Sequence, residues 1–174
     1  MNYPVEFVAY CLEEPPFFRT QYMGSYIHAK SLNDAGTPVY GMVALEMIGY
    51  FDDRAKSQSY PVKVMKVAYG RTGNFILLVQ EIKARAFTKN FSAGFKDLAV
   101  IDTKTLKAPS KIQGIDFSDH LNYWKFGYDA LMVTNTAFYR NYNYHQTTDT
   151  METLDISKMM KVIDTTVLAI MNLK

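Results

Sequence analysis

The sequence predicts an α/β fold built around a largely parallel sheet. Two observations carry this prediction. Short apolar runs of strand length alternate along the chain with segments of helical periodicity, which is the pattern of layered α/β proteins. Turn-forming residues such as the pair Thr37-Pro38 separate the segments.

The first part of the chain contains two expected strands and one helix. Residues 4–12 alternate in the manner of a strand, with Val5, Phe7 and Ala9 on one face. Residues 22–35 have helical spacing and are followed by the helix-stopping residue Gly36. Residues 39–48 form a nearly unbroken apolar run that is typical of a buried strand.

The middle of the chain is more polar. Residues 52–61 are rich in turn formers and indicate a loop, whereas the apolar run 74–80 predicts a strand. Residues 81–91 follow as an expected helix and 98–101 as a short strand. A long irregular connection is then expected over 102–118.

The last part begins with a short helix at 119–127, which a glycine ends, and a buried strand at 129–134. The final helix is expected over 156–172. Its apolar positions share one face, and Asp155 or Ser157 is expected to cap its N-terminus. No internal repeat or linker is visible, so residues 1–174 are expected to form a single domain.

Composition excludes several classes of protein. The chain has 174 residues, of which 48% are hydrophobic and 21% charged, and its net charge is +2. Lysines and arginines form no block, so neither a nucleic acid nor a membrane surface is indicated as a partner. No stretch is long and apolar enough to span a membrane, and no signal peptide is recognisable. The single cysteine, Cys11, allows no internal disulfide, and the compartment stays undetermined.

Glu46 is the most unusual residue, because it lies inside the apolar run 39–48 with no basic residue nearby in the sequence. A buried carboxylate is costly unless its charge is compensated. Either a distant arginine such as Arg140 or a metal cation could supply that compensation. No short zinc-binding motif is present to decide between them.

Further polar residues cluster where other expected strands end. Glu13 and Glu14 follow the first strand, and the loop after 129–134 contains Arg140, His145 and Asp149. Asp119 and His120 lie in the connection before that strand. Since ligand sites in open α/β sheets form outside the carboxyl ends of strands, these clusters can converge. Paired glutamates and single histidines also occur as ordinary surface residues, so spacing alone leaves both interpretations open.

The residue patterns of these clusters resemble those of one protein family. "VEFVAYCLEEPPFF", "GMVALEMIGYF", "SDHLNYW" and "YHQTTDT" resemble, in order, the C-terminal half of the di-zinc aminopeptidases, a family that includes bacterial leucyl aminopeptidases, glutamate carboxypeptidase and glutaminyl cyclase. The resemblance runs over most of the chain. It implies a three-layer α/β/α sandwich on a mixed, mostly parallel sheet, with the N-terminal part absent and two zinc ions at the strand ends.

The resemblance also implies residue roles. Glu13 matches the general base, Glu14 and His145 match ligands of one zinc, and Glu46 matches a ligand of the other. Imidazole nitrogen and carboxylate oxygen are ligands that zinc prefers. The remaining candidates match supporting or substrate-pocket positions: Asp119, His120, Arg140 and Asp149.

One departure from the family is serious. The family has two further ligands upstream, a histidine in an H-x-D motif and a bridging aspartate, and this chain has neither in the right order. His28 and the pair Asp52-Asp53 are both misplaced. We therefore expect the C-terminal portion of a peptidase catalytic domain, acting on peptides, with zinc partly bound or absent and with little activity by itself.

Two alternatives remain beside this zinc exopeptidase. The chain could be a non-catalytic remnant that serves as a binding or structural module, or it could carry a glutaminyl cyclase-like acyltransferase activity. An uncovered N-terminal side would also expose apolar surface, which predicts self-association there.

Overall fold

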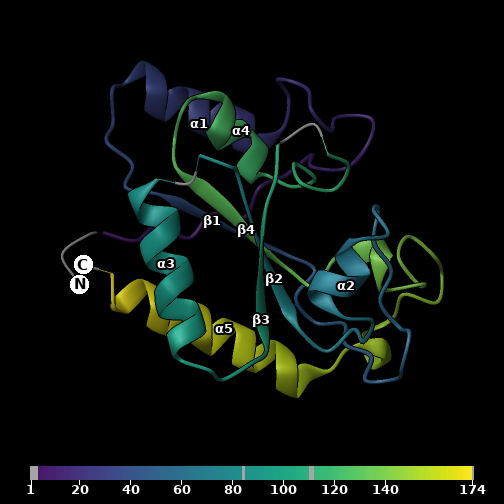
Figure 1. The fold of residues 1–174 in the computed structure, drawn as a ribbon. Helices are drawn as coiled ribbons and strands as arrows, with labels where there is room; N and C mark the ends of the chain where they lie inside the picture. Colours follow the sequence, from purple (N-terminus) through teal and green to yellow (C-terminus); the bar gives the residue numbers. More distant parts are fainter. Residues whose placement is uncertain (1–3, 84, 110–111, 174) are drawn as a thin grey trace.

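The computed structural model describes residues 4–83, 85–109 and 112–173 and contains one four-stranded sheet with helices on both faces (Figure 1). Two short 3-10 turns, Ala137–Tyr139 and Met151–Thr153, follow the last strand. The strands and α-helices, in chain order, are α1 Gly24–Asp34, β1 Met42–Glu46, α2 Met65–Tyr69, β2 Ile76–Gln80, α3 Ala86–Asp97, β3 Thr103–Lys107, α4 His120–Lys125, β4 Ala130–Thr134 and α5 Ile156–Met171.

The sheet combines two parallel pairs that run in opposite directions. The strand order is β1-β4-β2-β3, with β1 parallel to β4 and β2 parallel to β3, while β2 and β4 are antiparallel. Glu46 lies beside Thr134 in the first pair, and Leu77 lies beside Thr134 across the antiparallel junction. The carboxyl ends of β1 and β4 therefore share one end of the sheet, and those of β2 and β3 share the opposite end.

The two central strands are buried on both faces, which explains their unbroken apolar sequences. On one face, Ile76, Leu78, Leu131 and Val133 pack against α3 and α5. The other face is covered by α1 and α4, and Figure 1 shows these helices on the side of the sheet opposite α5. The predicted three-layer α/β arrangement on a mixed sheet is thus confirmed.

Helix α3 is held against the sheet by three phenylalanines at four-residue spacing. Phe87, Phe91 and Phe95 are all buried in the core between α3, α5 and the sheet. Phe87 lies so close to the chain before β1 that a Cβ atom on Gly41 would meet its ring at 1.9 Å. Only glycine fits at position 41.

Helix α5 begins as the sequence predicts. The Asp155 side chain accepts a hydrogen bond from the backbone N–H of Lys158 at 2.9 Å, which satisfies one of the free donors of the first turn. The Asp155 N–H in turn donates to the carbonyl of Gly49, so the same residue fixes the start of α5 to the chain after β1.

Residues 4–12 form no strand, and this prediction was wrong. The segment has the alternating sequence of a strand, but among the described residues β1 pairs only with β4. Residues 4–12 therefore form no backbone hydrogen bonds to a neighbouring strand. The segment is held instead by the Gly24 N–H, which donates to the Cys11 carbonyl at 2.9 Å. Phe7 is 88% exposed as a result. Self-association through this apolar side stays a prediction.

Two boundaries in the middle of the chain also differ from expectation. Helix α3 begins at Ala86 and ends at Asp97, later than the predicted range 81–91. The expected strand 98–101 is absent, and β3 lies within the supposed irregular connection. Its Thr-Lys alternation gives almost no apolar signal because β3 is an edge strand. Within the described residues, no helix has the length and apolar character needed to cross a membrane.

The α3 packing leads to a stability prediction. Replacing Phe91, which is 0% exposed, by alanine should lower the free energy of unfolding by about 3–5 kcal/mol, because it leaves a cavity between α3 and the sheet. Chemical denaturation measures this change. The matched variant Phe7→Ala, at an exposed position, should shift stability by less than about 0.5 kcal/mol. Equal effects of the two variants would contradict the packing described.

Candidate active site

The end of the sheet where β1 and β4 finish carries the predicted cluster. Glu46 is the last residue of β1, and β4 continues beyond Thr134 into the loop that contains His145. Glu14 reaches the same place from the segment before α1. Its Oε1 atom lies 3.1 Å from Nε2 of His145, although 131 positions separate the two residues.

Glu46 accepts a hydrogen bond from one hydroxyl group and lies close to other carboxylates. The Ser118 hydroxyl donates to its Oε2 atom at 2.9 Å. Burial raises the pKa of Glu46, and the nearby charges of Asp119 and Glu14 raise it further, while the Ser118 hydrogen bond acts in the opposite direction. Arg140 is not the partner of Glu46, because the Arg140 side chain donates instead to Gln58 and to the carbonyls of Tyr50 and Phe75.

Glu13 lies within the same electrostatic environment. Burial raises its pKa to about 7, with further contributions from the charges of Glu46, Glu14 and Asp119. Burial and the charges of Glu14, Glu46 and Glu13 raise the pKa of Tyr144 to about 12. These mutual effects indicate that Glu13, Glu14, Glu46 and Tyr144 face a common space.

The backbone is strained beside three of the candidate residues. Leu12, directly before Glu13, has φ 60°, Met47, directly after Glu46, has φ 48°, and His145 itself has φ 58°. Left-handed backbone at a non-glycine residue is uncommon and costs on the order of 1–3 kcal/mol. Such residues occur often at functional sites, so the strain agrees with the choice of cluster. Five other non-glycine residues of the described chain share this conformation: Arg19, Lys56, Ala99, Thr136 and Ala137.

The loop that carries His145 is held by its own contacts. The imidazole stacks on the Tyr144 ring, with ring centres 3.9 Å apart and 16° between the planes. The Asn141 amide donates to Asp149 at 3.1 Å and accepts from the Asn143 N–H at 2.9 Å. The hydrogen bond from Asn141 to Asp149 therefore joins the two sides of the loop around His145.

Asp119 and His120 differ in their relation to the cluster. The charge of Asp119 raises the pKa values of Glu13 and Glu46. Burial raises the pKa of Asp119 itself, while a hydrogen bond with Ser25 lowers it. His120 is fully buried, and its Nε2 atom lies 2.8 Å from the carbonyl of Ile115. Burial lowers the pKa of His120 to about 4, so it is neutral at pH 7 and can donate this N–H. It fixes the chain just before Ser118.

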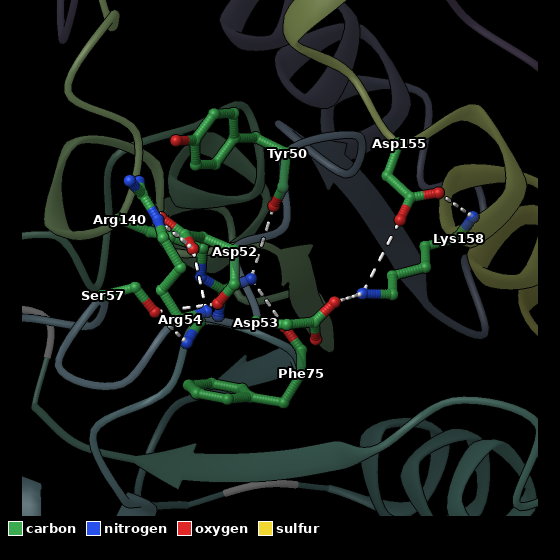
Figure 2. Close-up of polar contacts among 10 residues, drawn as sticks. Tyr50, Asp52, Asp53, Arg54, Ser57, Phe75, Arg140, Asp155 and Lys158 are labelled. Carbon is green, nitrogen blue, oxygen red and sulfur yellow. Dashed lines mark hydrogen bonds and ion pairs between the residues drawn. The ribbon is translucent and has the colours of Figure 1, made fainter.

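Arg140 lies beneath the loop and is 0% exposed. Figure 2 shows its side chain reaching the backbone of Tyr50 and Phe75, with Nη1 2.8 Å from the Phe75 carbonyl and 3.5 Å from the Tyr50 carbonyl. Its Nε atom donates to Gln58 at 2.8 Å. Burial lowers its pKa to about 10, so it stays charged at pH 7. Gly73 makes room for it, since a Cβ atom there would meet the Arg140 side chain at 2.8 Å.

The segment "SQS" at 57–59 is a set of supporting residues that the sequence did not reveal. The Gln58 amide donates to the Thr136 hydroxyl at 2.8 Å, besides accepting from Arg140. The N–H and hydroxyl of Ser59 both donate to the Tyr139 carbonyl. These contacts hold the start of the loop after β4, and the polar run 57–59 by itself predicts only a loop.

An apolar pocket opens beside Glu46 on the α1 and α4 face of the sheet. Its volume is about 90 Å³, which is well below the roughly 300–1,000 Å³ of sites that enclose whole ligands. The space suits a single side chain. Apart from Glu46 and a few polar groups, the lining is mainly apolar and includes Leu77, Met132, Ile115, Phe117 and Phe138.

The fit to zinc is partial. Two ligands of one tetrahedral zinc lie roughly 3.3–3.6 Å apart, because each bond is about 2.0–2.2 Å, and the Glu14–His145 separation of 3.1 Å is close to this. A catalytic zinc takes three protein ligands. Within the described ranges, no group of three or more His, Cys, Asp or Glu side chains is arranged to hold a metal ion. Donor types and spacing fit, whereas the number of donors does not.

Sequence comparison places the chain in a known class. A profile of peptidase family M28 matches residues 1–170, so the chain belongs to this peptidase family. It is also 46% identical over 173 residues to a protein of Escherichia coli (strain K12) named "Uncharacterized protein YfbL". That alignment covers 98% of this chain and 52% of the relative, so the chain spans about half the length of the curated relative it matches.

Solved aminopeptidases share the fold. The LapA aminopeptidase of Legionella pneumophila superposes with a TM-score of 0.59 at 16% identity, over 84% of this chain and 34% of LapA. An aminopeptidase from Aneurinibacillus sp. strain AM-1 gives 0.59 at 17% identity, over 86% and 30%. BSAP, a zinc aminopeptidase from Bacillus subtilis, gives 0.58 at 12% identity, over 84% and 31%. At these identities the likeness shows that the chain shares the fold of these aminopeptidases.

The Arg140 contacts predict a large effect on stability. Arg140→Met should lower the free energy of unfolding by about 2 kcal/mol or more, because it leaves the Phe75 carbonyl and the Gln58 amide oxygen buried without a donor. Arg71→Met removes an exposed arginine that forms no ion pair among the described residues, and should change stability by at most about 0.5 kcal/mol. Urea denaturation of both variants decides the matter, and similar losses would contradict an anchoring role.

The crowded glutamates predict a pH dependence in protein stripped of metal by a chelator. The pKa of Glu13 rises from 4.5 to about 7 on folding, so the folded protein holds this proton more tightly than the unfolded chain does. The free energy of unfolding should therefore fall as the pH rises through this range. Glu13→Gln should remove a decrease on the order of 1 kcal/mol, allowing for solvent screening.

The control for this prediction is Glu152→Gln, because the pKa of Glu152 is lowered, chiefly by a hydrogen bond to Thr150. That variant should keep the decrease between pH 4.5 and 7. A wild-type stability that rises over this interval would show that the glutamates do not crowd one another.

Proposed function

We propose that this chain is the C-terminal portion of a zinc-dependent aminopeptidase, which hydrolyses the first peptide bond of its substrates. One observation carries the proposal: Glu14 and His145 meet at 3.1 Å beside Glu13 and Glu46, at the carboxyl ends of β1 and β4. Membership of peptidase family M28 and the aminopeptidase fold support it.

The proposed metal ligands are Glu14 and His145 for one zinc and Glu46 for a second. When bound, zinc would polarise the substrate carbonyl and lower the pKa of a coordinated water molecule. Burial raises the pKa values of Glu13 and Glu46, and repulsion from the neighbouring carboxylates raises them further. A cation at this position would relieve that repulsion.

Glu13 is the proposed general base. Its carboxylate would accept a proton from the attacking water and return it to the leaving amine nitrogen. Glu13 is suited to this role because it makes no ion pair among the described residues that would hold it in the charged form, and its environment favours proton uptake near neutral pH.

Tyr144 is a candidate for stabilising negative charge on the substrate. Its hydroxyl stays protonated at pH 7, since burial and the neighbouring glutamates raise its pKa to about 12. Stacking against His145 holds the ring beside a proposed ligand. A fixed donor at this place could bind the oxygen on which charge develops during attack.

The apolar pocket beside Glu46 is the proposed site for the side chain of the substrate's first residue. Its lining is mainly apolar and its volume of about 90 Å³ suits one side chain. A leucine or a similar apolar residue would gain free energy by leaving water there. An anionic side chain would lose its hydration there and would lie near the carboxylate of Glu46.

Residues outside this chain are the proposed source of the missing ligands. The curated relative is about twice as long, and the donors described in this chain fall short of a complete site. We therefore expect the isolated chain to bind at most one zinc weakly and to have little aminopeptidase activity.

The test measures zinc by elemental analysis and cleavage of leucyl-p-nitroanilide. Fusing or adding the corresponding N-terminal half of a longer relative should restore both zinc binding and turnover. In the restored enzyme, Glu13→Gln should reduce kcat by at least about a hundredfold and leave zinc bound. Aspartyl-p-nitroanilide should be a poor substrate.

Other outcomes would overturn the proposal. An isolated chain that holds two zinc ions tightly and turns over at about 1 per second or faster would show that no further ligands are needed. Zinc bound without any hydrolysis by the restored protein would favour a binding module. Cyclisation of an N-terminal glutaminyl peptide would favour an acyltransferase.

A further inference from the structure

A second pocket lies near the carboxyl ends of β2 and β3, at the end of the sheet opposite the proposed catalytic cluster. It is a groove of about 510 Å³ between α3 and the edge strand β3, within the size range of sites for small ligands. Its wall along α3 consists of Lys89, Ser92, Ala93 and Lys96. These positions follow the spacing i, i+3, i+4, i+7 and so share one face of the helix.

Positive charge collects in this groove without compensation. Among the described residues, three lysines line it, Lys89 and Lys96 from α3 and Lys107 from β3, and no aspartate or glutamate does. Within the part of the chain that the structure describes, none of the three forms an ion pair with a carboxylate. The other lysine of β3, Lys104, does pair with Asp102.

One atom of a buried side-chain amide in the groove also lacks a hydrogen-bond partner. Gln80 is 1% exposed, its Nε2 atom donates to the Ser92 hydroxyl, and its Oε1 atom has no hydrogen-bond partner. Rotating the amide by 180° would let Oε1 accept from Ser92 and leave Nε2 without an acceptor instead. In either orientation, one polar atom of this buried side chain has no partner among the described residues and is available to a ligand or water.

A hydroxyl group adds to this polar lining. The Thr105 Oγ1 atom is buried and has no partner among the described residues, and Thr105 lies on the groove next to Gln80 and Lys107. A hydroxyl can donate its hydrogen to an anionic oxygen. The groove therefore offers neutral donors as well as ammonium groups.

The topology favours a ligand at this place. Strands β2 and β3 are parallel and joined by α3, and Gln80 and Lys107 are their paired last residues. In open α/β sheets, ligands bind outside the carboxyl ends of the strands. Because β2 and β3 run opposite to β1 and β4, the sheet has two such ends, and the proposed peptidase site uses only one of them.

We propose that the groove between α3 and β3 binds a compact oxyanion with at least two negative charges, such as a phosphate group or a small polycarboxylate. Lys89, Lys96 and Lys107 would neutralise its charge. The Thr105 hydroxyl and the amide of Gln80, with its nitrogen turned outward, would donate to its oxygens. The site is separate from the proposed peptidase function and does not depend on it.

The test is a titration of the isotopically labelled chain with inorganic phosphate, and separately with citrate, followed by amide NMR shifts at constant ionic strength. We expect saturable shifts at α3 and β3 with a millimolar or lower Kd. Tighter binding of phosphate would identify a phosphate site, and tighter binding of citrate a polycarboxylate site. Linear shifts without saturation for both anions would overturn the proposal.

Charge-matched variants separate a site from general attraction to a basic protein. Lys89→Gln with Lys96→Gln should weaken binding roughly tenfold or more, since charge-assisted hydrogen bonds are lost. Lys63→Gln with Lys161→Gln removes the same charge from exposed positions outside the groove and should leave Kd within about twofold. Equal weakening by the two pairs would refute a specific site. Gln80→Leu should also weaken binding while keeping all three lysines.

Discussion

Strand β4 determines the arrangement on which the rest of the structure depends. It pairs in parallel with β1 and antiparallel with β2, so the sheet consists of two parallel halves of opposite direction. The first half ends at Glu46 and continues into the His145 loop, while the second ends at Gln80 and Lys107. The two ends differ in charge because the first collects glutamates and the second collects lysines. One strand placement thus separates an anionic cluster from a cationic groove.

The anionic cluster is held together by contacts beneath it. Arg140 joins the loop after β4 to the carbonyls before β2 and after β1, and Gln58 connects it to Thr136. A guanidinium suits this place because several N–H groups in one plane can satisfy carbonyls from different segments. Other contacts hold the strained residues: the Met47 carbonyl accepts from the Asn135 N–H at 2.8 Å, and His145 contacts Glu14 and stacks on Tyr144.

The sequence predicts the elements whose signal is local. The runs 39–48, 74–80 and 129–134 contain β1, β2 and β4, and the apolar sequences of β2 and β4 follow from burial along their whole length. Prediction from the sequence fails for 4–12, because a strand also needs a partner strand. It fails for β3 too, because its partly exposed edge position permits alternating Thr and Lys. The cluster is predictable in part because Glu46 interrupts an apolar run. The burial of Arg140 is not, since its partners lie 65 to 90 positions away and are mostly backbone carbonyls.

The central claim is that Glu14 and His145 act together as ligands of one zinc in a peptidase site. The most direct measurement is a crystal structure of the chain soaked in zinc, with anomalous diffraction data collected at the zinc absorption edge. The account predicts an anomalous peak between Nε2 of His145 and a carboxylate oxygen of Glu14, within about 2.0–2.2 Å of each. A zinc peak only at another histidine, such as His28, with His145 and Glu14 free of metal, would contradict it.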